Sequence, residues 1–196
     1  MVEKAEQRLL ELIRQHAYRY SPDAPFQLAS GRHSPHYVDL RALLCLPEAL
    51  VATGTIIFDR IKQFERETNT KVQAIGGPAE GAIPIAAAVA YHSDQTSEPI
   101  ETFYVRKEPK AHGLRKWVEG HRGASSNVVI VDDVVTTGSS TLKAIQAAQD
   151  HGFRVVKIIA LVDRLEGGNE KLSNLGVPYE AVFTLNEIAG VPSDRP

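Results

Sequence analysis

Short, continuously apolar segments alternate with stretches of helical periodicity, and this alternation limits the chain to few folds. The five clearest segments, rich in β-branched and aromatic residues, are KVQAIGG (71–77), TFYVRKE (102–108), NVVIVDD (127–133), VVKIIALVD (155–163) and YEAVFTL (179–185). Strands that are apolar on both faces are typical of a parallel sheet that helices cover on both sides. The sequence therefore predicts an α/β fold built on a parallel sheet.

Helical periodicity supplies the elements between these strands. Residues 3–18 predict an amphipathic helix, and a second helix is expected from Pro47, which suits a first helical position, to about Glu67. An alanine-rich helix should follow the turn GGPAEG (76–81), and another should run from Ser139 to His151. Residues 26–40, around SGRHSP, predict short strands and a turn.

The composition excludes several classes of protein. The 196 residues, 43% hydrophobic and 23% charged, suit one soluble globular domain. The net charge of -2 gives no reason to expect nucleic-acid binding, and a single cysteine, Cys45, fits a reducing compartment. No apolar run reaches the roughly 20 residues that cross a membrane, and the charged N-terminus lacks the apolar core of a signal peptide. We therefore expect a cytoplasmic protein without a nucleic-acid or membrane partner.

The segment VVIVDDVVTTGSST (128–141) carries the strongest chemical signal. Asp132 and Asp133 stand side by side after an apolar strand, although adjacent carboxylates repel each other and resist burial. Ligands of parallel α/β sheets bind beyond the carboxyl ends of the strands. The following loop leads into a helix, so its backbone N–H groups can hold an anion, and Gly138 permits a close approach. A ribose 5-phosphate would place its phosphate on the loop and its vicinal hydroxyls on the acids.

Two observations limit the alternatives for this segment. A lone Asp-Asp pair is a turn or capping element about as often as it is a functional site. A turn or cap would leave the hydroxyl-rich loop after it unexplained. The chain has no Gly-x4-Gly-Lys sequence, which disfavours a P-loop ATPase.

A basic segment lies between the second and third strand candidates. Residues 106–122 hold six Lys or Arg against two acids, whereas the whole chain is slightly acidic. A charge run is usually a solvated loop. The sequence KEPKAHG within it is more specific than that interpretation requires.

These segments resemble a known family. The run of strand, DD and TTGSST resembles the phosphoribosyl-pyrophosphate (PRPP) signature of the type I phosphoribosyltransferases. KEPKAHG resembles the mobile catalytic loop of orotate phosphoribosyltransferases, FQLASGRHSPHYVDLR their N-terminal segment, LVDRLEGG their carboxylate-binding arginine and GGPAEGAIPIA their pyrophosphate loop. The resemblance spans about Phe26 to Gly168, with the motifs in the family's order.

The resemblance implies roles for individual residues. The catalytic candidates are Lys110, His112, Asp132 and Asp133. The PRPP-binding candidates are Arg106, Lys107, Lys110, His112, Asp132, Asp133, Val134, Val135, Thr136, Thr137, Gly138, Ser139 and Ser140. The orotate-binding candidates are Thr136, Arg164, Tyr37 and Val38, with the guanidinium fork of Arg164 matching the carboxylate. For an isolated arginine a surface salt bridge would be the better interpretation.

The resemblance also implies an architecture. It is a type I phosphoribosyltransferase fold with a five-stranded parallel sheet flanked by helices. A small hood, from about residues 1–45 and C-terminal pieces, covers the base above a core of about 46–165. The active unit is a homodimer whose 106–122 loop acts in trans. Mg²⁺ is held mainly by PRPP, so no protein side chain is assigned to it.

The activity implied is transfer of the phosphoribosyl group of PRPP to orotate, which gives orotidine 5'-monophosphate and pyrophosphate in pyrimidine biosynthesis. Two alternatives stay open: a phosphoribosyltransferase for another base, such as a purine, and a non-catalytic regulator that senses PRPP. Some family members carry lysines where Ala29 stands and near Glu80, so these two residues receive no side-chain role.

Overall fold

The computed structural model describes residues 2–27, 31–108 and 117–191. Its helices are α1 (Val2–His16), the 3-10 helix η1 (Leu43–Cys45), α2 (Pro47–Thr68), α3 (Ala82–Asp94), α4 (Ser139–Asp150), α5 (Gly168–Ser173) and α6 (Leu185–Ala189). Its strands are β1 (Tyr18–Tyr20), β2 (Phe26–Gln27), β3 (His33–Ser34), β4 (His36–Val38), β5 (Ala74–Pro78), β6 (Glu101–Val105), β7 (Val118–Gly120), β8 (Asn127–Val135), β9 (Arg154–Asp163) and β10 (Tyr179–Thr184). None of the described helices combines the length and the apolar character that a membrane crossing requires.

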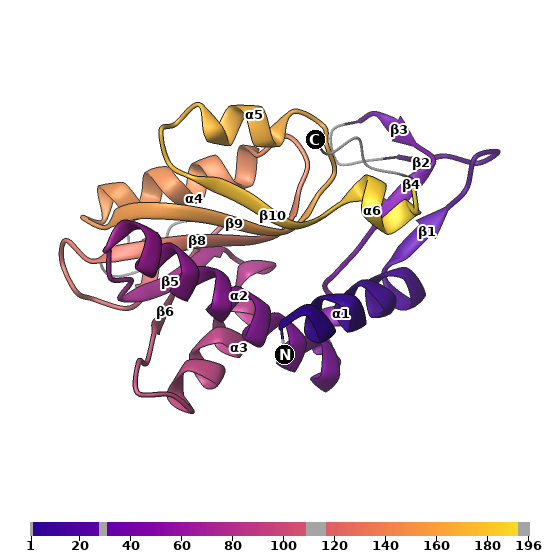
Figure 1. Cartoon of the computed structure of the whole chain (residues 1–196). Coiled ribbons are helices and arrows are strands. Elements are labelled where there is room, and N and C mark those ends of the chain that lie inside the picture. The colour runs from indigo at the N-terminus through magenta and orange to yellow at the C-terminus, as the bar shows by residue number, and fades with distance from the viewer. Residues whose placement is uncertain (1, 28–30, 109–116, 192–196) are drawn as a thin grey trace.

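The main sheet has the strand order β10-β9-β8-β5-β6-β7 (Figure 1). The first five of these strands are parallel to one another, which confirms the predicted parallel sheet. The sixth, β7, pairs antiparallel with β6 and was not predicted, because three residues that end in a glycine leave little pattern. The chain adds strands outward from β5 first on one side and then on the other. The point where β5 meets β8 is therefore the topological switch point, where ligands of such sheets bind.

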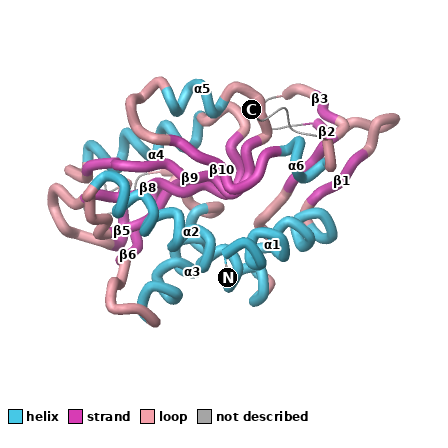
Figure 2. The backbone as a smooth tube through the Cα atoms, viewed as in Figure 1, coloured by secondary structure: helices cyan, strands magenta, loops and turns pink. Residues whose placement is uncertain are grey.

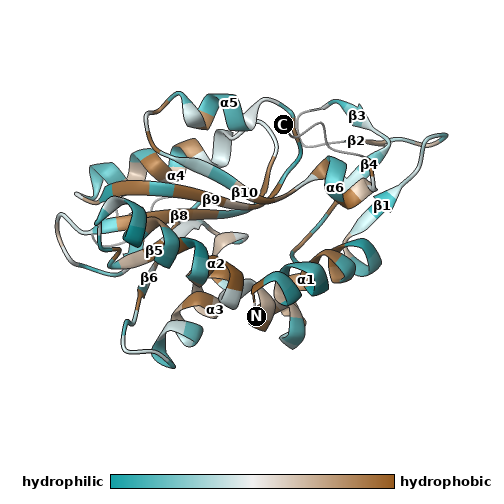
Figure 3. Cartoon of the chain, viewed as in Figure 1, coloured by the Kyte–Doolittle hydropathy of each residue, from teal (hydrophilic) through white to brown (hydrophobic). Residues whose placement is uncertain are grey.

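Helices cover both faces of the sheet, with α4 and α5 on one side and α2 and α3 on the other (Figures 1 and 2). Successive residues of β8 point alternately into two apolar cores. Val129 and Val131 pack with the α2 and α3 side, whereas Val128 and Ile130 pack with α4. The hydropathy colouring shows the resulting apolar centre of the sheet between the polar outer faces of the helices (Figure 3).

The N-terminal part adds two small antiparallel sheets, β1 with β4 and β2 with β3, which we call the hood strands. They lie beyond the carboxyl ends of the main strands (Figure 1). The first helix ends at His16, two residues before the predicted end, because the chain turns there into β1. The second helix begins at Pro47 and ends at Thr68, as predicted to within one residue, and the fourth begins at Ser139 as predicted. The short helices α5 and α6 were not predicted.

Candidate active site

A cleft of about 630 Å³ opens at the carboxyl ends of β8 and β9, between them and the hood strands. It brings together ten of the candidate residues: Tyr37, Val38, Asp133, Val134, Thr136, Thr137, Gly138, Ser139, Ser140 and Arg164. Asp132 and Val135 do not line the cleft, because both are buried, and Arg106 and Lys107 line a separate cavity. The loop of residues 136–140, Asp133 and the base-binding candidates therefore share one cavity.

The loop between β8 and α4 forms one wall of this cleft. Gly138 has a φ of 71°, a left-handed conformation in which a side chain is strained, and it directly precedes α4. The side chains of Thr137 and Ser139 share a hydrogen bond of 3.1 Å at the open side of the loop. Free N–H groups at the start of α4 and these hydroxyls give the loop the chemistry of an anion site.

The two adjacent acids face different environments, since neighbouring residues of a strand point to opposite sides. Asp132 is 4% exposed, and its Oδ2 accepts hydrogen bonds from Thr141 Oγ1 at 2.7 Å and from Ser140 Oγ at 3.3 Å. Burial, and then the charge of Asp133, raises the pKa of Asp132 to about 7. Asp132 thus fastens the first turn of α4, and Asp133 is the acid that lines the cleft.

Asp133 also touches the turn after β5. A Cβ placed on Gly81 would lie 2.3 Å from Asp133 Oδ1, so glycine is needed there for the acid to keep its position. Burial of Asp133 is only partial, and its Oδ1 accepts a hydrogen bond of 2.9 Å from the Val134 N–H. The Asp133 carboxylate also interacts with that of Asp132, and it lines the cleft.

A second cavity of about 450 Å³ adjoins this turn and is lined by Ala79, Glu80, Tyr104, Arg106, Lys107 and Glu108. Lys107 Nζ lies 3.1 Å from Glu80 Oε1, and Arg106 Nη1 lies 3.4 Å from Glu119 Oε1. Both pairs are substantially exposed, so an anionic ligand can replace the acids as partner of the cations at small cost. The candidates Lys110 and His112, like Ala29, lie outside the described residues.

Arg164 forms the opposite wall of the main cleft, at the end of β9. Its backbone N–H donates to Val135 O at 2.9 Å, and the Gly168 N–H donates to Thr136 O at 3.1 Å, so its turn is tied to the anion loop. The Asp163 carboxylate supports the same turn from beneath. Its two oxygens accept from the Leu165 N–H at 2.7 Å and from the Tyr179 hydroxyl at 2.8 Å. Burial, and then the hydrogen bond with Asp163, raises the pKa of the Tyr179 hydroxyl, which therefore stays a donor.

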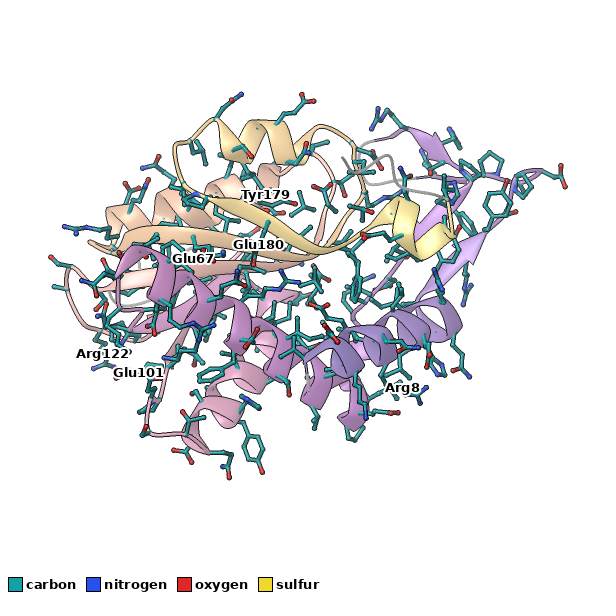
Figure 4. The ribbon with its side chains drawn as sticks, in the orientation of Figure 1. Arg8, Glu67, Glu101, Arg122, Tyr179 and Glu180 are labelled. Carbon is teal, nitrogen blue, oxygen red and sulfur yellow. The ribbon has the colours of Figure 1, made fainter. Side chains whose placement is uncertain are left out.

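Figure 4 labels Tyr179 and its neighbour Glu180, which point to opposite faces of β10. Tyr179 reaches Asp163 on the α4 and α5 side, whereas Glu180 Oε2 lies 3.1 Å from Lys157 Nζ on the other. Only the first of these contacts supports the cleft.

The guanidinium of Arg164 is held by two groups from distant segments. Its Nη2 donates to the backbone oxygen of His36 in β4 at 3.1 Å, and its Nε lies 3.1 Å from Glu166 Oε1. The side chain is 5% exposed, and Nε has no aligned hydrogen-bond partner within the described part of the chain. A buried guanidinium with unused donors beside a cleft suits an anionic ligand.

Four residues that line the cleft were not among the candidates: Gln27, Asp39, Leu40 and Arg41. Arg41 follows β4 and forms a two-pronged pair with Asp39, at 2.9 and 2.7 Å. Glu166, which contacts Arg164, was not a candidate either. The sequence HYVDLR and the acid two residues after Arg164 were the available signals, but neither shows which way the side chains point.

Among the described residues there is no group of three or more His, Cys, Asp or Glu side chains placed to hold a metal ion. Two carboxylates line the cleft, Asp133 and Asp39, the second of which is paired with Arg41. Carboxylate and phosphate oxygens are the ligands that Mg²⁺ prefers.

Residues 46–178 match the family described as phosphoribosyl transferase domain. The chain is 38% identical over 182 residues to the orotate phosphoribosyltransferase of Aquifex aeolicus (strain VF5), a match that covers 93% of this chain and 96% of that protein. It is 36% identical over 192 residues to the orotate phosphoribosyltransferase of Sorangium cellulosum (strain So ce56), with 97% and 95% covered.

Solved structures agree with these sequence matches. The crystal structure of Mycobacterium tuberculosis H37Rv orotate phosphoribosyltransferase in complex with Fe(III) dicitrate superposes with a TM-score of 0.77 and 32% identity, over 94% of this chain and 98% of that one. The structure of the same protein in complex with PRPP gives a TM-score of 0.71 and 27% identity, over 94% and 92%. Adenine phosphoribosyltransferase from Leishmania donovani, at 19% identity and a TM-score of 0.61, shows the fold alone.

Proposed function

The chain belongs to the orotate phosphoribosyltransferase family, and from that premise we propose that it transfers the phosphoribosyl group of PRPP to orotate. The products are orotidine 5'-monophosphate and pyrophosphate, in pyrimidine biosynthesis. One observation supports this most strongly: a single cleft has an anion loop at one end and a buried arginine with unused donors at the other. Orotidine 5'-monophosphate carries a phosphate at one end and a carboxylate at the other.

In the proposed complex the 5'-phosphate of PRPP lies on the loop of residues 136–140, with backbone N–H groups and hydroxyls as donors. Asp133 accepts hydrogen bonds from the ribose hydroxyls. Asp132 acts beneath it by fixing Thr141 and Ser140 at the start of α4. The loop and the acids then hold the anomeric carbon facing the Arg164 side of the cleft.

In the reaction, the bond from the anomeric carbon to the diphosphate oxygen breaks, and the orotate ring nitrogen forms the new bond to that carbon after losing its proton. The transition state has oxocarbenium character, and negative charge gathers on the departing diphosphate. Arg106 and Lys107 line the adjoining cavity and stabilise that charge, as do Lys110 and His112 of the segment outside the described residues. The ion pair between Lys107 and Glu80 breaks when the diphosphate binds, and Lys107 then contacts the diphosphate.

Mg²⁺ fits this site: PRPP oxygens would supply most of its ligands, and the Asp133 carboxylate lines the same cleft. The ion would neutralise diphosphate charge and so make it a better leaving group. The protein's own part is to hold the ribose hydroxyls and the diphosphate of PRPP in place, so that oxygens of both groups could bind the same ion.

Base selection is assigned to Arg164, with Tyr37 and Val38 covering the base and Thr136 reaching both substrates. A planar guanidinium binds a carboxylate through two parallel hydrogen bonds, which a base without a carboxylate cannot supply. The division into a hood of about residues 1–45 with C-terminal pieces and a core of about 46–165 is part of the same proposal, since Tyr37 and Val38 come from the hood strands.

The active unit is proposed to be a cytoplasmic homodimer in which the 106–122 loop acts on the partner's site. An apolar cavity of about 410 Å³ between α2 and α3 supports a second copy, since Val51 and Tyr91 beside it are 66% and 73% exposed. The helix α3 starts directly after the turn that lines the second cavity, the one beside Arg106 and Lys107. A copy docked between α2 and α3 would therefore lie near that cavity.

Complementation tests this arrangement. Lys110→Ala and Asp133→Ala chains, each inactive alone, are mixed under conditions that allow subunit exchange. Action in trans gives each mixed dimer one intact site, so activity should return to about a quarter of the parent value. Inactivity despite confirmed exchange would contradict action in trans.

The activity itself is tested by following orotate consumption spectrophotometrically with PRPP and Mg²⁺, and by offering hypoxanthine in place of orotate. We expect turnover of orotate only. Turnover of hypoxanthine alone would favour a purine enzyme. RNA binding at physiological salt without any turnover would favour a PRPP-sensing regulator.

A further inference from the structure

We propose that Glu166 is a positioning residue that selects which edge of the Arg164 guanidinium a substrate can reach. It occupies the side edge of the guanidinium, so the terminal fork is left for a carboxylate. The inference rests on the proposed function, because the carboxylate is taken to be that of orotate.

The contacts of Arg164 carry this assignment. The side edge consists of Nε and Nη2, and these two nitrogens face Glu166 Oε1 and the His36 carbonyl at 3.1 Å each. Nη1 has no partner among the described residues. The terminal edge, Nη1 with the second hydrogen of Nη2, is therefore available to a ligand, and two parallel hydrogen bonds to a carboxylate require such an edge.

The environment makes this orientation consequential. The side chains of Arg164 and Glu166 are 5% and 13% exposed, so water cannot freely replace either partner. The Nε–H is not aligned with the Glu166 oxygen as a hydrogen bond requires, so the contact is an ion pair. A carboxylate at the terminal edge would add the aligned hydrogen bonds that this contact lacks.

Glu166 also links this arginine to the hood. Its Oε2 accepts from Nη2 of Arg32, which precedes β3 and is 60% exposed. Two arginines share one acid, so the cluster has one positive charge in excess, which matches one ligand carboxylate. Glu166 thus holds the base-binding arginine and the turn before β3 in one network.

A purely electrostatic role for Glu166 makes the opposite prediction. If the acid only lowered the positive charge, its removal would strengthen the attraction for orotate and lower the KM for orotate. If it positions the guanidinium, its removal raises that KM even though the site becomes more positive. The sign of the change separates the two roles.

The kinetic test compares Glu166→Ala and Glu166→Gln with the parent, with Glu170→Ala as the matched control on the exposed side of α5. We expect Glu166→Ala to raise the KM for orotate about tenfold and to leave the KM for PRPP within about twofold, because misplacing a binding group by a fraction of an ångström is costly. The KM for orotate of Glu166→Gln should fall between those of the parent and Glu166→Ala, since the amide keeps the shape of the side chain beside Nε but lacks its charge. Glu170→Ala should match the parent.

A double variant shows whether Glu166 acts through Arg164. Glu166→Ala added to Arg164→Ala should not reduce the kcat/KM for orotate further, because the group that it positions is already gone. A fall in the orotate KM of Glu166→Ala, equal rises in both KM values, or full additivity in the double variant would overturn the proposal.

A measurement without substrate keeps this inference separate from the proposed function. The Arg164 Nε–Hε signal, assigned by its loss in Arg164→Lys, can be followed by NMR in ¹⁵N-labelled protein. We expect it to shift and to exchange faster with water in Glu166→Ala than in Glu170→Ala. If the parent does not turn over orotate, the proposed function fails while this signal still decides the positioning role. An unchanged signal would overturn it.

Discussion

The two ends of the cleft are built in different ways. The phosphate end comes from one continuous stretch, β8 with the loop and the first turn of α4, and its main contacts join residues within ten positions. The base end joins segments far apart in the chain, with Arg164 donating to His36 across 128 positions and Arg32 to Glu166 across 134. The phosphate end should therefore keep its shape without the hood, whereas the base end should depend on the hood being in place.

The largest effect is expected at the phosphate and ribose end. Asp133→Asn should lower kcat by about two orders of magnitude or more, because an amide accepts hydrogen bonds from the ribose hydroxyls less well and does not offset the developing positive charge. The melting temperature should change little, since Asp133 is only partly buried. Steady-state kinetics and thermal unfolding check both parts, with Asp150→Asn on the far end of α4 as control. If the activity of Asp133→Asn were close to that of the parent, the proposed role of Asp133 would be wrong.

The next largest effect is expected at the base end. Arg164→Ala should lower the kcat/KM for orotate about 100-fold and leave the affinity for PRPP nearly unchanged, because the arginine meets only the base. Arg164→Lys should not restore activity, since one ammonium cannot replace a fork. Arg66→Ala, on the exposed side of α2, is the control. Equal losses for both substrates would show that the two ends are not separate.

The third prediction concerns stability. Since the pKa of Asp132 is raised from 3.8 to about 7 in the folded protein, the native state binds a proton that the unfolded state releases. Folding stability therefore falls as pH rises from about 4 to about 7 and then levels off. Asp132→Asn carries no ionisable group, so its stability relative to the parent should rise over that range by roughly 2–4 kcal/mol.

Urea unfolding of both proteins at several pH values measures this difference. A constant difference across the range would show that Asp132 is not buried in a way that favours its neutral form.

The smallest effect tests the geometry of the anion loop. Gly138→Ala places a side chain at a φ of 71° and should cost about 1 kcal/mol of stability. It should also raise the KM for PRPP a few-fold, because the loop N–H groups shift. Gly152→Ala is a matched control: its φ is 96°, a Cβ there meets nothing within 4 Å, and it lies away from the cleft. Equal KM values for the two variants would argue against the loop as the phosphate site.

The contrast between the two ends also explains what the sequence could predict. The parallel sheet and the anion loop follow from short segments whose neighbours in the chain are also neighbours in space. The division of labour between Asp132 and Asp133 depends on the pleat of β8, and a motif of two identical residues does not reveal it. Glu166 and Arg41 were missed because their positions are set by how the hood strands sit on the sheet. The strand β7 was missed because it is too short to carry a pattern.

The most direct test of the account is a crystal structure with orotidine 5'-monophosphate, because that one molecule spans the cleft. The account predicts the phosphate on the N–H groups of the 136–140 loop, the ribose hydroxyls on Asp133 and the carboxylate on the terminal edge of Arg164. A carboxylate bound away from Arg164, or a phosphate bound in the cavity beside Lys107 instead of on the loop, would contradict it.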